Sequence, residues 1–358
     1  MAISIINHSK IIASKVVARF KEDIPVRAGF SQFFPRETTA TLHVDIEVER
    51  DNDTIAVDVQ RFTEGNKNKL TRATEKKYQP PYYREEYDFQ RDDIYLNTVG
   101  MGVMNNSNVN QAIAQNALKN VRNNRKRIER AIRVQMSQVL QTGIVELKNG
   151  ENIDYKRKAA SMVDLGAGNY WDEAGTDPRT SIATGMRFLR DEGNSSSITA
   201  NVIMRSSAMN AFLGNEKVIA GAEIRRISRE KIDMPQFNET SGLAYHGQYA
   251  ADDFVVNLWT YNEKYTNEAG DTQHYLDESN VIILPSDFRG KTVFGGLPTM
   301  VNRNIGGQSI QVPSVVESEF LLRGYSDEKT MSSTLELTSA PLVIPYTIDK
   351  VYTIKVLA

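Results

Sequence analysis

The sequence predicts a mixed α+β protein, because one long helical segment stands among many short segments of strand character. Its 358 residues correspond to about two domains at roughly 150 residues per domain, or to one elongated molecule. Hydrophobic residues make up 40% of the chain and charged residues 25%, which are ordinary values for a globular protein. We therefore expect an ordered chain in which helices and strands share a core.

The composition excludes several classes of function. The chain has no cysteine, so disulfides, thiolate nucleophiles, iron–sulfur clusters and Cys-ligated zinc are ruled out. A net charge of −2 gives no overall electrostatic case for tight binding to nucleic acid or membrane. No apolar run approaches the roughly 18 residues of a membrane span, and charged residues interrupt the N-terminal segment. We expect an unprocessed cytosolic product with no membrane partner.

The first 60 residues predict an arm followed by a hairpin. Ile12, Val16 and Phe20 recur at helical spacing, and Pro25 and Gly29 then end any regular element. Apolar and polar residues alternate over residues 42–48 and again over 55–59, which is typical of half-buried strands. Turn residues separate the two runs at 50–53. The pattern predicts an amphipathic N-terminal arm and a β-hairpin.

Residues 64–91 form a long polar excursion that contains tyrosines, prolines and almost no aliphatic residues. Aromatic side chains are enriched where two protein surfaces meet. We therefore predict an extended arm that becomes ordered only against a partner. The expected inter-subunit contact residues are Tyr78, Pro80, Pro81, Tyr82, Tyr83, Glu85 and Glu86.

A spine helix is predicted over residues 107–143, with Ser107 as the N-cap and Gly143 as the stop. At 1.5 Å per residue it is about 50 Å long, which suits an elongated molecule. One apolar face consists of Ala117, Val121, Ile128, Ile132, Met136 and Val139. A separate arc about 80° wide carries the basic stripe, Lys119, Arg122, Lys126, Arg130 and Arg133. The stripe fits a solvated helix face, or a cationic wall that faces a polyanion or an acidic neighbour.

The second half of the chain alternates short helices and strands. Two short strands are expected within residues 144–154, around the turn Asn149-Gly150. The remaining pattern predicts helices near 182–190, 206–213 and 216–228, and strands near 200–204, 254–261, 281–284, 292–294 and throughout 334–358.

No motif for catalysis rises above background. Gly100-Met101-Gly102 lacks the third glycine of a dinucleotide fingerprint, and no phosphate-binding loop or Gly-x-Ser-x-Gly occurs. The four histidines are scattered without metal-ligand spacing. We predict no catalytic, cofactor-binding or metal site, no cofactor, and therefore no enzyme.

The order of these features resembles the major capsid proteins of tailed bacteriophages, in the family of the lambda phage major head protein. No single motif is diagnostic, but order and spacing persist over some 320 residues. The segments that carry the resemblance are FFPR at 33–36, VERDNDTIAVDVQRFTEG at 48–65, YQPPY at 78–82, ERAIRVQMSQVLQTG at 129–143 with Ile153-Asp154-Tyr155, Trp171 with Asp177-Pro178, SAPL at 339–342, and 351–358.

The resemblance implies the tailed-phage (Hong Kong phage) capsid fold. Its expected parts are an N-arm (1–36), an extended loop with the β-hairpin and polar arm (37–100), a peripheral domain with the spine helix (101–180), an axial α/β domain (181–333), and C-terminal strands that return to the peripheral domain (334–358).

The resemblance also implies a function. The expected role is a major capsid protein that self-assembles into hexamers and pentamers of an icosahedral shell around double-stranded DNA. It would be made and assembled in the host cytoplasm and end in the virion capsid. Expected partners are the protein itself, scaffold, portal and decoration proteins, and loosely held DNA. The alternatives are another self-assembling phage subunit, such as a tail or decoration protein, and a DNA-binding module that uses the basic stripe.

Overall fold

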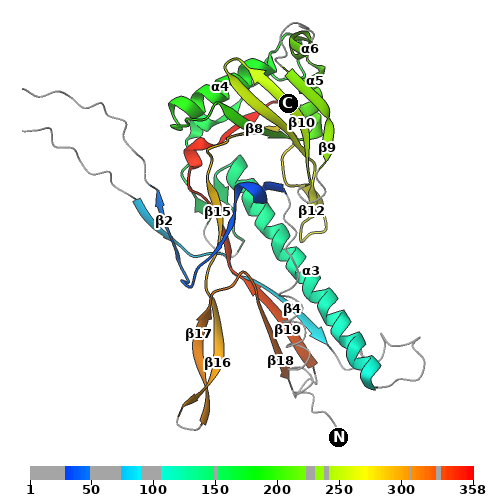
Figure 1. The fold of residues 1–358 in the computed structure, drawn as a ribbon, viewed down its shortest axis with the longest axis vertical. Helices are drawn as coiled ribbons and strands as arrows, with labels where there is room; N and C mark the ends of the chain where they lie inside the picture. Colours follow the sequence, from blue (N-terminus) through cyan, green and yellow to red (C-terminus); the bar gives the residue numbers. More distant parts are fainter. Residues whose placement is uncertain are drawn as a thin grey trace, which may run out of the picture.

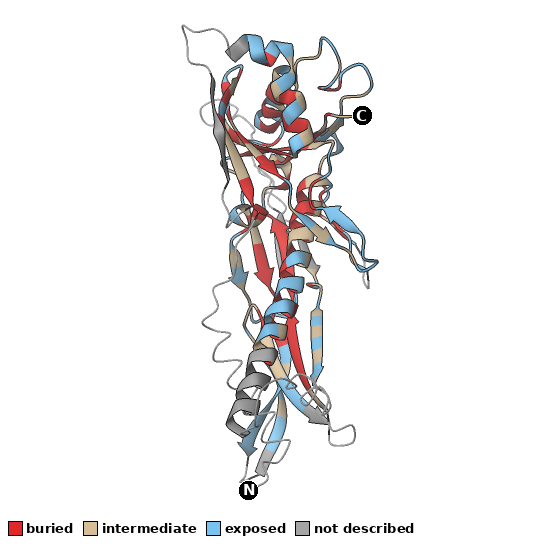
Figure 2. Cartoon of the chain, turned by 90° about the vertical axis from the view of Figure 1, so that its right-hand side faces the viewer, coloured by how far each residue is buried: buried red, intermediate tan, exposed pale blue. Residues whose placement is uncertain are grey.

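The computed structural model describes residues 29–48, 74–89, 106–148, 152–222, 230–237, 242–305, 308–327 and 332–358. The described chain is elongated, with a broad α/β lobe at one end and a helix with narrow sheets and ribbons at the other (Figures 1 and 2). The predicted N-terminal arm helix, the turn at 50–53 and the strand at 55–59 lie outside the described residues.

The long helix α3 spans Asn106–Gln141, 36 residues, so the predicted spine helix is confirmed. All six residues of its predicted apolar face are buried. Gly143 takes a left-handed φ of 73°, and its N–H donates to the carbonyls of Gln138 and Val139. A glycine there ends the helix without a steric penalty, as the sequence predicts.

The broad lobe is built on a seven-stranded mixed sheet. Its order is β7 (Met162–Asp164), β21 (Tyr352–Lys355), β14 (Asn280–Pro285), β8 (Thr199–Met204), β11 (Phe254–Tyr261), β10 (Leu243–Ala251) and β9 (Glu230–Phe237). Helices α4 (Pro178–Asp191) and α5 (Ser206–Gly214) pack on one face, and α6 (Glu216–Ala222) follows α5 (Figure 1). Asp177 caps α4 by accepting a hydrogen bond from the Arg179 backbone N–H.

The two faces of this sheet belong to two hydrophobic clusters. On β14, Val281 and Ile283 join the cluster beneath α4 and α5, together with Trp171. Ile282 and Leu284 point the other way and join the cluster around the C-terminal half of α3. Because side chains alternate across a strand, one buried run of β14 connects both cores.

Two three-stranded sheets lie along α3 and extend away from the broad lobe. One has the order β1 (Arg36–Thr38), β15 (Gly290–Phe294) and β20 (Pro341–Pro345). The other has the order β18 (Leu321–Asp327), β19 (Ser332–Ser339) and β4 (Tyr83–Phe89). Leu335 and Leu337 of β19 are buried.

Among the described residues, four two-stranded ribbons and three short 3-10 helices complete the fold. The ribbons are β2–β3 (Val44–Val48 with Thr74–Tyr78), β5–β6 (Ile144–Val145 with Ile153–Asp154), β12–β13 (Lys264–Thr266 with Thr272–His274) and β16–β17 (Leu297–Ile305 with Gln308–Val316). The 3-10 helices are η1 (Gly29–Phe33), η2 (Ala159–Ser161) and η3 (Ile348–Lys350).

Several predictions differ from the structure. Residues 74–89 of the predicted polar arm are the intramolecular strands β3 and β4, which find partners in β2 and β19. The strand at 44–48 is confirmed and pairs with β3. Its predicted hairpin partner at 55–59 lies outside the described residues, so that pairing stays a prediction. Strands β15 to β18 fall within the expected axial segment, residues 181–333, but are not strands of the seven-stranded sheet, whereas β21 of the expected C-terminal segment is one. The expected domain bounds stay a prediction.

Candidate assembly interface

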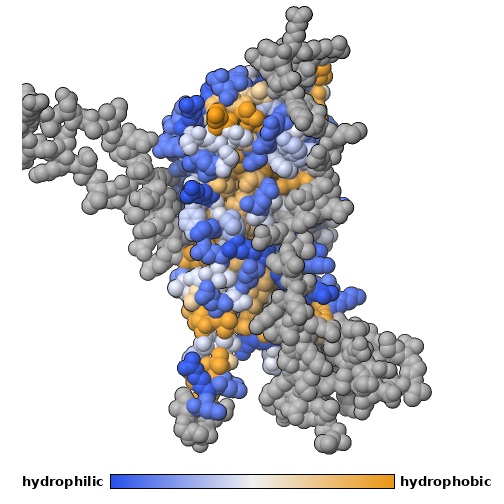
Figure 3. Space-filling model, in the orientation of Figure 1, coloured by the Kyte–Doolittle hydropathy of each residue, from blue (hydrophilic) through white to orange (hydrophobic). Residues whose placement is uncertain are grey.

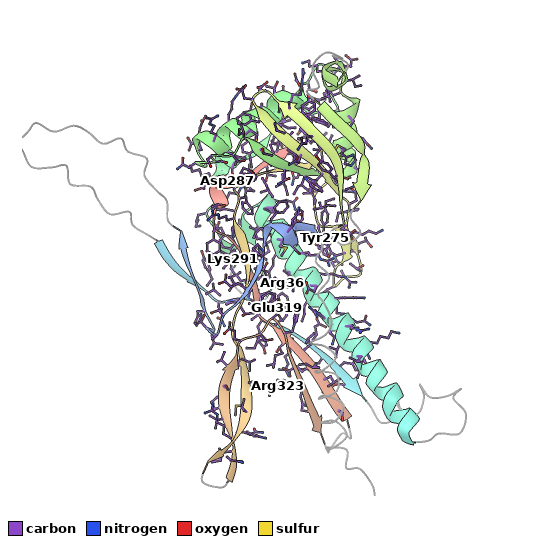
Figure 4. All side chains as sticks on the ribbon, in the orientation of Figure 1. Arg36, Tyr275, Asp287, Lys291, Glu319 and Arg323 are labelled. Atoms are coloured by element: carbon purple, nitrogen blue, oxygen red, sulfur yellow. The ribbon has the colours of Figure 1, made fainter. Side chains whose placement is uncertain are left out.

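Strand β1 pairs with β15 and is followed by the loop that leads to the β2–β3 ribbon, and the first residue of β1 is Arg36. Its Nη2 lies 2.5 Å from Glu129 of α3 and its Nη1 2.9 Å from Glu319, just before β18 (Figure 4). Burial alone would lower the pKa of Arg36, but the hydrogen bonds and charges of these carboxylates raise it above its ordinary value. One guanidinium therefore fixes the base of the ribbon to the spine helix and to the β17–β18 corner.

Aromatic residues anchor the chain just before Arg36. Phe30 and Phe34 are fully buried, and the Phe30 ring packs against Tyr261 at 4.8 Å. Gly29 takes a φ of 62°, and a Cβ there would lie 2.6 Å from the Tyr261 hydroxyl oxygen. This position therefore requires glycine, because both the backbone angle and the close approach exclude a side chain.

The predicted aromatic contact residues divide between core and surface. Pro80 is buried, and the Tyr78 ring packs against Tyr155. Tyr83 accepts a hydrogen bond from Gln135 of α3, and burial raises its pKa. Tyr82 is 49% exposed, and Pro81 is half-buried beside it. Tyr82 is thus the aromatic residue of this group that the subunit leaves most open to a neighbour.

The predicted acidic contact residues have partners within the chain. Glu85 accepts from Arg127 of α3 at 3.1 Å. Glu86 pairs with Arg84, which also reaches Glu336 of β19. The Glu85–Arg127 pair joins β4 to α3, and the Arg84–Glu336 pair joins β4 to β19. The Glu86–Arg84 pair lies within β4.

The basic stripe lies on the outer side of α3. Lys119, Arg122, Lys126 and Arg130 are exposed, and Arg133 is half-buried. Burial raises the pKa of Tyr275, while the charges of Arg133 and Arg130 act to lower it. The structure thus turns the stripe away from the core, as the helical periodicity predicts.

A buried arginine, Arg157, which carries no signal in the sequence, joins α3 to the broad lobe. Arg157 donates to the carbonyls of Leu140 and Gln141 at the end of α3, to Ser161, and to Val351 and Thr353. Its Cβ lies 2.7 Å from the position that a Cβ on Gly143 would take. Burial lowers the pKa of Arg157 to about 9, so it is cationic at neutral pH. A cation also suits the negative end of a helix dipole.

A second polar junction links the start of β8 to the C-terminal region. Asp287 accepts hydrogen bonds from Ser195 Oγ, the Ser196 backbone N–H and Lys350 Nζ. Burial alone would raise the pKa of Asp287, but these donors and the Lys350 charge lower it below its ordinary value. The junction is fully paired and structural in character.

Neither a metal centre nor a membrane span is found in the described ranges. Their His, Asp and Glu residues form no group of three or more that could hold a metal ion. Among their helices, none is both long enough and apolar enough to cross a membrane.

Comparisons with known proteins agree with this architecture. The family model of phage major capsid protein E matches residues 18–356. A solved structure from Escherichia coli CFT073, described as a candidate prophage capsid protein, superposes with a TM-score of 0.64 at 15% identity, covering 97% of this chain and 99% of its own.

Two other solved structures overlap more loosely. A phage-related protein from Bordetella bronchiseptica has 10% identity and a TM-score of 0.47, covering 97% of this chain and 96% of its own. A capsid subunit of cyanophage A-1(L) has 14% identity and a TM-score of 0.45, with 94% of each chain covered. No curated protein sequence matches.

The family match spans nearly the whole chain and confirms the resemblance drawn from the sequence. The superposition with the prophage protein shows the same mixed fold along both chains. The chain therefore belongs to the phage major capsid protein E family.

Proposed function

We propose that the protein self-assembles into hexamers and pentamers of an icosahedral shell that encloses phage double-stranded DNA. Membership of the capsid protein family carries the proposal. The shape of the subunit supports it, because a helix of 36 residues and projecting ribbons offer more surface than one subunit can bury (Figure 1). The protein would act in the virion as a structural subunit without catalysis, after synthesis in the host cytoplasm.

Electron microscopy tests this function. Purified protein, concentrated under near-physiological salt, is expected to form shells, capsomers or tubes in negative stain. A preparation that stays as single small particles, with and without co-expressed phage proteins, would contradict the proposal. The preparation with co-expressed phage proteins also tests whether scaffold and portal proteins are partners, as expected.

Tyr82 and Pro81 are the predicted contact residues that we retain for contact with a neighbouring subunit. Tyr82 is 49% exposed and the neighbouring Pro81 is half-buried, which supports this role. Leu42, in the segment just before β2, is also 49% exposed. Tyr78, Pro80 and Tyr83 support it indirectly, because they hold the loop to the subunit core.

The basic stripe is proposed to face acidic side chains of a neighbouring subunit. Like charges at i,i+4 repel by a few tenths of a kcal/mol per pair, so a compensating surface would stabilise the helix. Glu85 and Glu86 already have partners within the chain, so the compensating carboxylates would come from elsewhere. Packaged DNA is the second candidate, held loosely and without sequence preference.

Charge reversal separates these two partners of the stripe. If the stripe contacts a neighbouring subunit, the double variant Lys119→Glu, Lys126→Glu should fail to form shells even when no DNA is present. Lys264→Glu, an exposed lysine of β12, is the control. Normal shells that fail only to package DNA would contradict the protein contact and favour phosphate.

A further inference from the structure

The β16–β17 ribbon projects from the subunit away from the broad lobe (Figure 1). Its strands of nine residues each pair only with one another in the part of the chain that the structure describes. An isolated two-stranded ribbon is marginally stable in water and normally packs on something else. The ribbon therefore has a packing requirement that no other strand among the described residues meets.

One face of the ribbon carries a block of four exposed apolar residues. Pro298 lies opposite Val315, and Met300 lies opposite Pro313, so these two adjacent pairs share one face. Met300 is 50% exposed and Val315 42% exposed. Figure 3 shows apolar surface around the root of the ribbon. This apolar block is an unusual feature to leave in contact with water.

The two prolines also make both free edges of the ribbon poor sites for pairing with a further strand. Proline has no backbone N–H, and the pairs that hold Pro298 and Pro313 are two positions apart, so they belong to the same alternate set. In an antiparallel ribbon, alternate residue pairs are not hydrogen-bonded to each other, and the N–H groups of these residues point outward to the free edges. Both prolines fit these outward positions, because no hydrogen bond between the two strands is lost there. Each free edge therefore lacks one backbone N–H donor, at Pro298 on β16 and at Pro313 on β17. A partner is thus directed to the face of the ribbon, because strand addition is disfavoured.

The charge of the ribbon indicates what covers this face. Residues 297–316 contain a single charged residue, Arg303, in a chain that is 25% charged. Copies of one protein carry identical charges, so any charged face repels the same face of another copy. DNA or an acidic partner would instead select basic residues. A neutral apolar face is the surface that suits contact with its own copy.

We propose that the apolar block of one ribbon packs against the equivalent ribbon of a second copy of this chain. The proposal rests on the proposed function, because it requires that copies assemble. It deepens that function by assigning one of the contacts between subunits to Met300, Val315, Pro298 and Pro313.

Single-cysteine crosslinking tests the contact directly. The wild-type chain has no cysteine, so an introduced thiol has no background. Met300→Cys is expected to give crosslinked dimers with a short bismaleimide in assembled shells. Val301→Cys is the matched control, since its side chain is also exposed, at 38%, but points to the opposite face. Most Met300→Cys chains should crosslink, and few Val301→Cys chains.

A charge variant provides the second measurement. Met300→Glu places like charges on both copies and should cause loss of most closed shells, while the thermal midpoint of the free subunit stays at the wild-type value. Shells of Met300→Cys that form without crosslinks, or equal crosslinking of Val301→Cys, would overturn the ribbon contact and leave the proposed function intact. Wild-type protein that stays monomeric under assembly conditions would overturn both.

Discussion

Replacing Arg157 by methionine should loosen the joint between α3 and the broad lobe. Methionine retains most of the apolar stem of the side chain, so little space is lost, but every guanidinium donor disappears. The carbonyls of Gln141, Ser161 and Val351 lose the Arg157 donor. Leu140 O keeps a hydrogen bond from Thr353 Oγ1.

The expected loss follows from these three acceptors. A buried polar group left without its partner costs about 1–3 kcal/mol. Taking the low end for each carbonyl, because removal of a buried charge offsets part of the cost, gives about 3 kcal/mol of unfolding free energy. Arg157→Lys should lose nearly as much, since an ammonium has three N–H donors for the six acceptor contacts of the guanidinium.

Urea unfolding of the free subunit measures this loss. The two tryptophans, Trp171 beneath α5 and Trp259 of β11, both lie in the broad lobe, so tryptophan fluorescence reports on its unfolding. The control is Arg187→Met, which removes an arginine from an exposed pair with Asp252 and should cost less than about 1 kcal/mol. Equal losses for the two variants, or a loss below about 1 kcal/mol for Arg157→Met, would refute the assignment of Arg157 as the joint.

Three further predictions concern stability. Arg36→Ala should cost about 3 kcal/mol in urea unfolding, because Glu129, with a side chain 11% exposed, is left without its nearest cation; a loss as small as that of Arg187→Met would contradict this. Gly29→Ala should cost about 2 kcal/mol through its left-handed φ and the approach to Tyr261, and unchanged stability would disprove the constraint. Asp287→Asn should lose stability at neutral pH. The pKa of Asp287 is lower in the folded state than its ordinary value of 3.8. The stabilisation that ionised Asp287 gives the fold is therefore complete above about pH 3.8, and it is lost as the pH falls through the pKa of the folded state. A difference between variant and wild type that stays constant from pH 7 to pH 2 would exclude this linkage.

Elements with strong local signals are predicted closely by the sequence. The apolar periodicity of α3 and the stop at Gly143 place its C-terminal end within two residues. The strand predicted at 254–261 has the bounds of β11, because its side chains alternate and turns flank it. The helices predicted near 182–190 and 206–213 are α4 and α5. The helix predicted at 216–228 is described only over Glu216–Ala222.

The missed elements depend on partners far away in the sequence. Strand β4 has the polar sequence YREEYDF, which is typical of a surface segment. In the structure, Glu85 and Tyr83 accept hydrogen bonds from α3, and the strand pairs with β19. Local patterns carry no information on these partners. The ribbon β16–β17 was missed as well, although Gly306-Gly307 between two runs of β-branched residues is a hairpin signal that could have found it. Arg157 has no sequence signal, since its acceptors are four backbone carbonyls and the hydroxyls of Ser161 and Thr353, none of which marks a partner in the sequence.

The pairing of distant strands has a consequence for the synthesis of the subunit. Strand β1 lies beside β15, β4 beside β19, and β21 completes the central sheet between β7 and β14. Contacts so far apart in sequence raise the contact order and slow folding. Neither sheet beside α3 nor the central sheet can close until residues beyond 330 have left the ribosome, so nascent chains hold unpaired edges. A subunit with all of its sheets closed therefore appears only when translation is nearly finished.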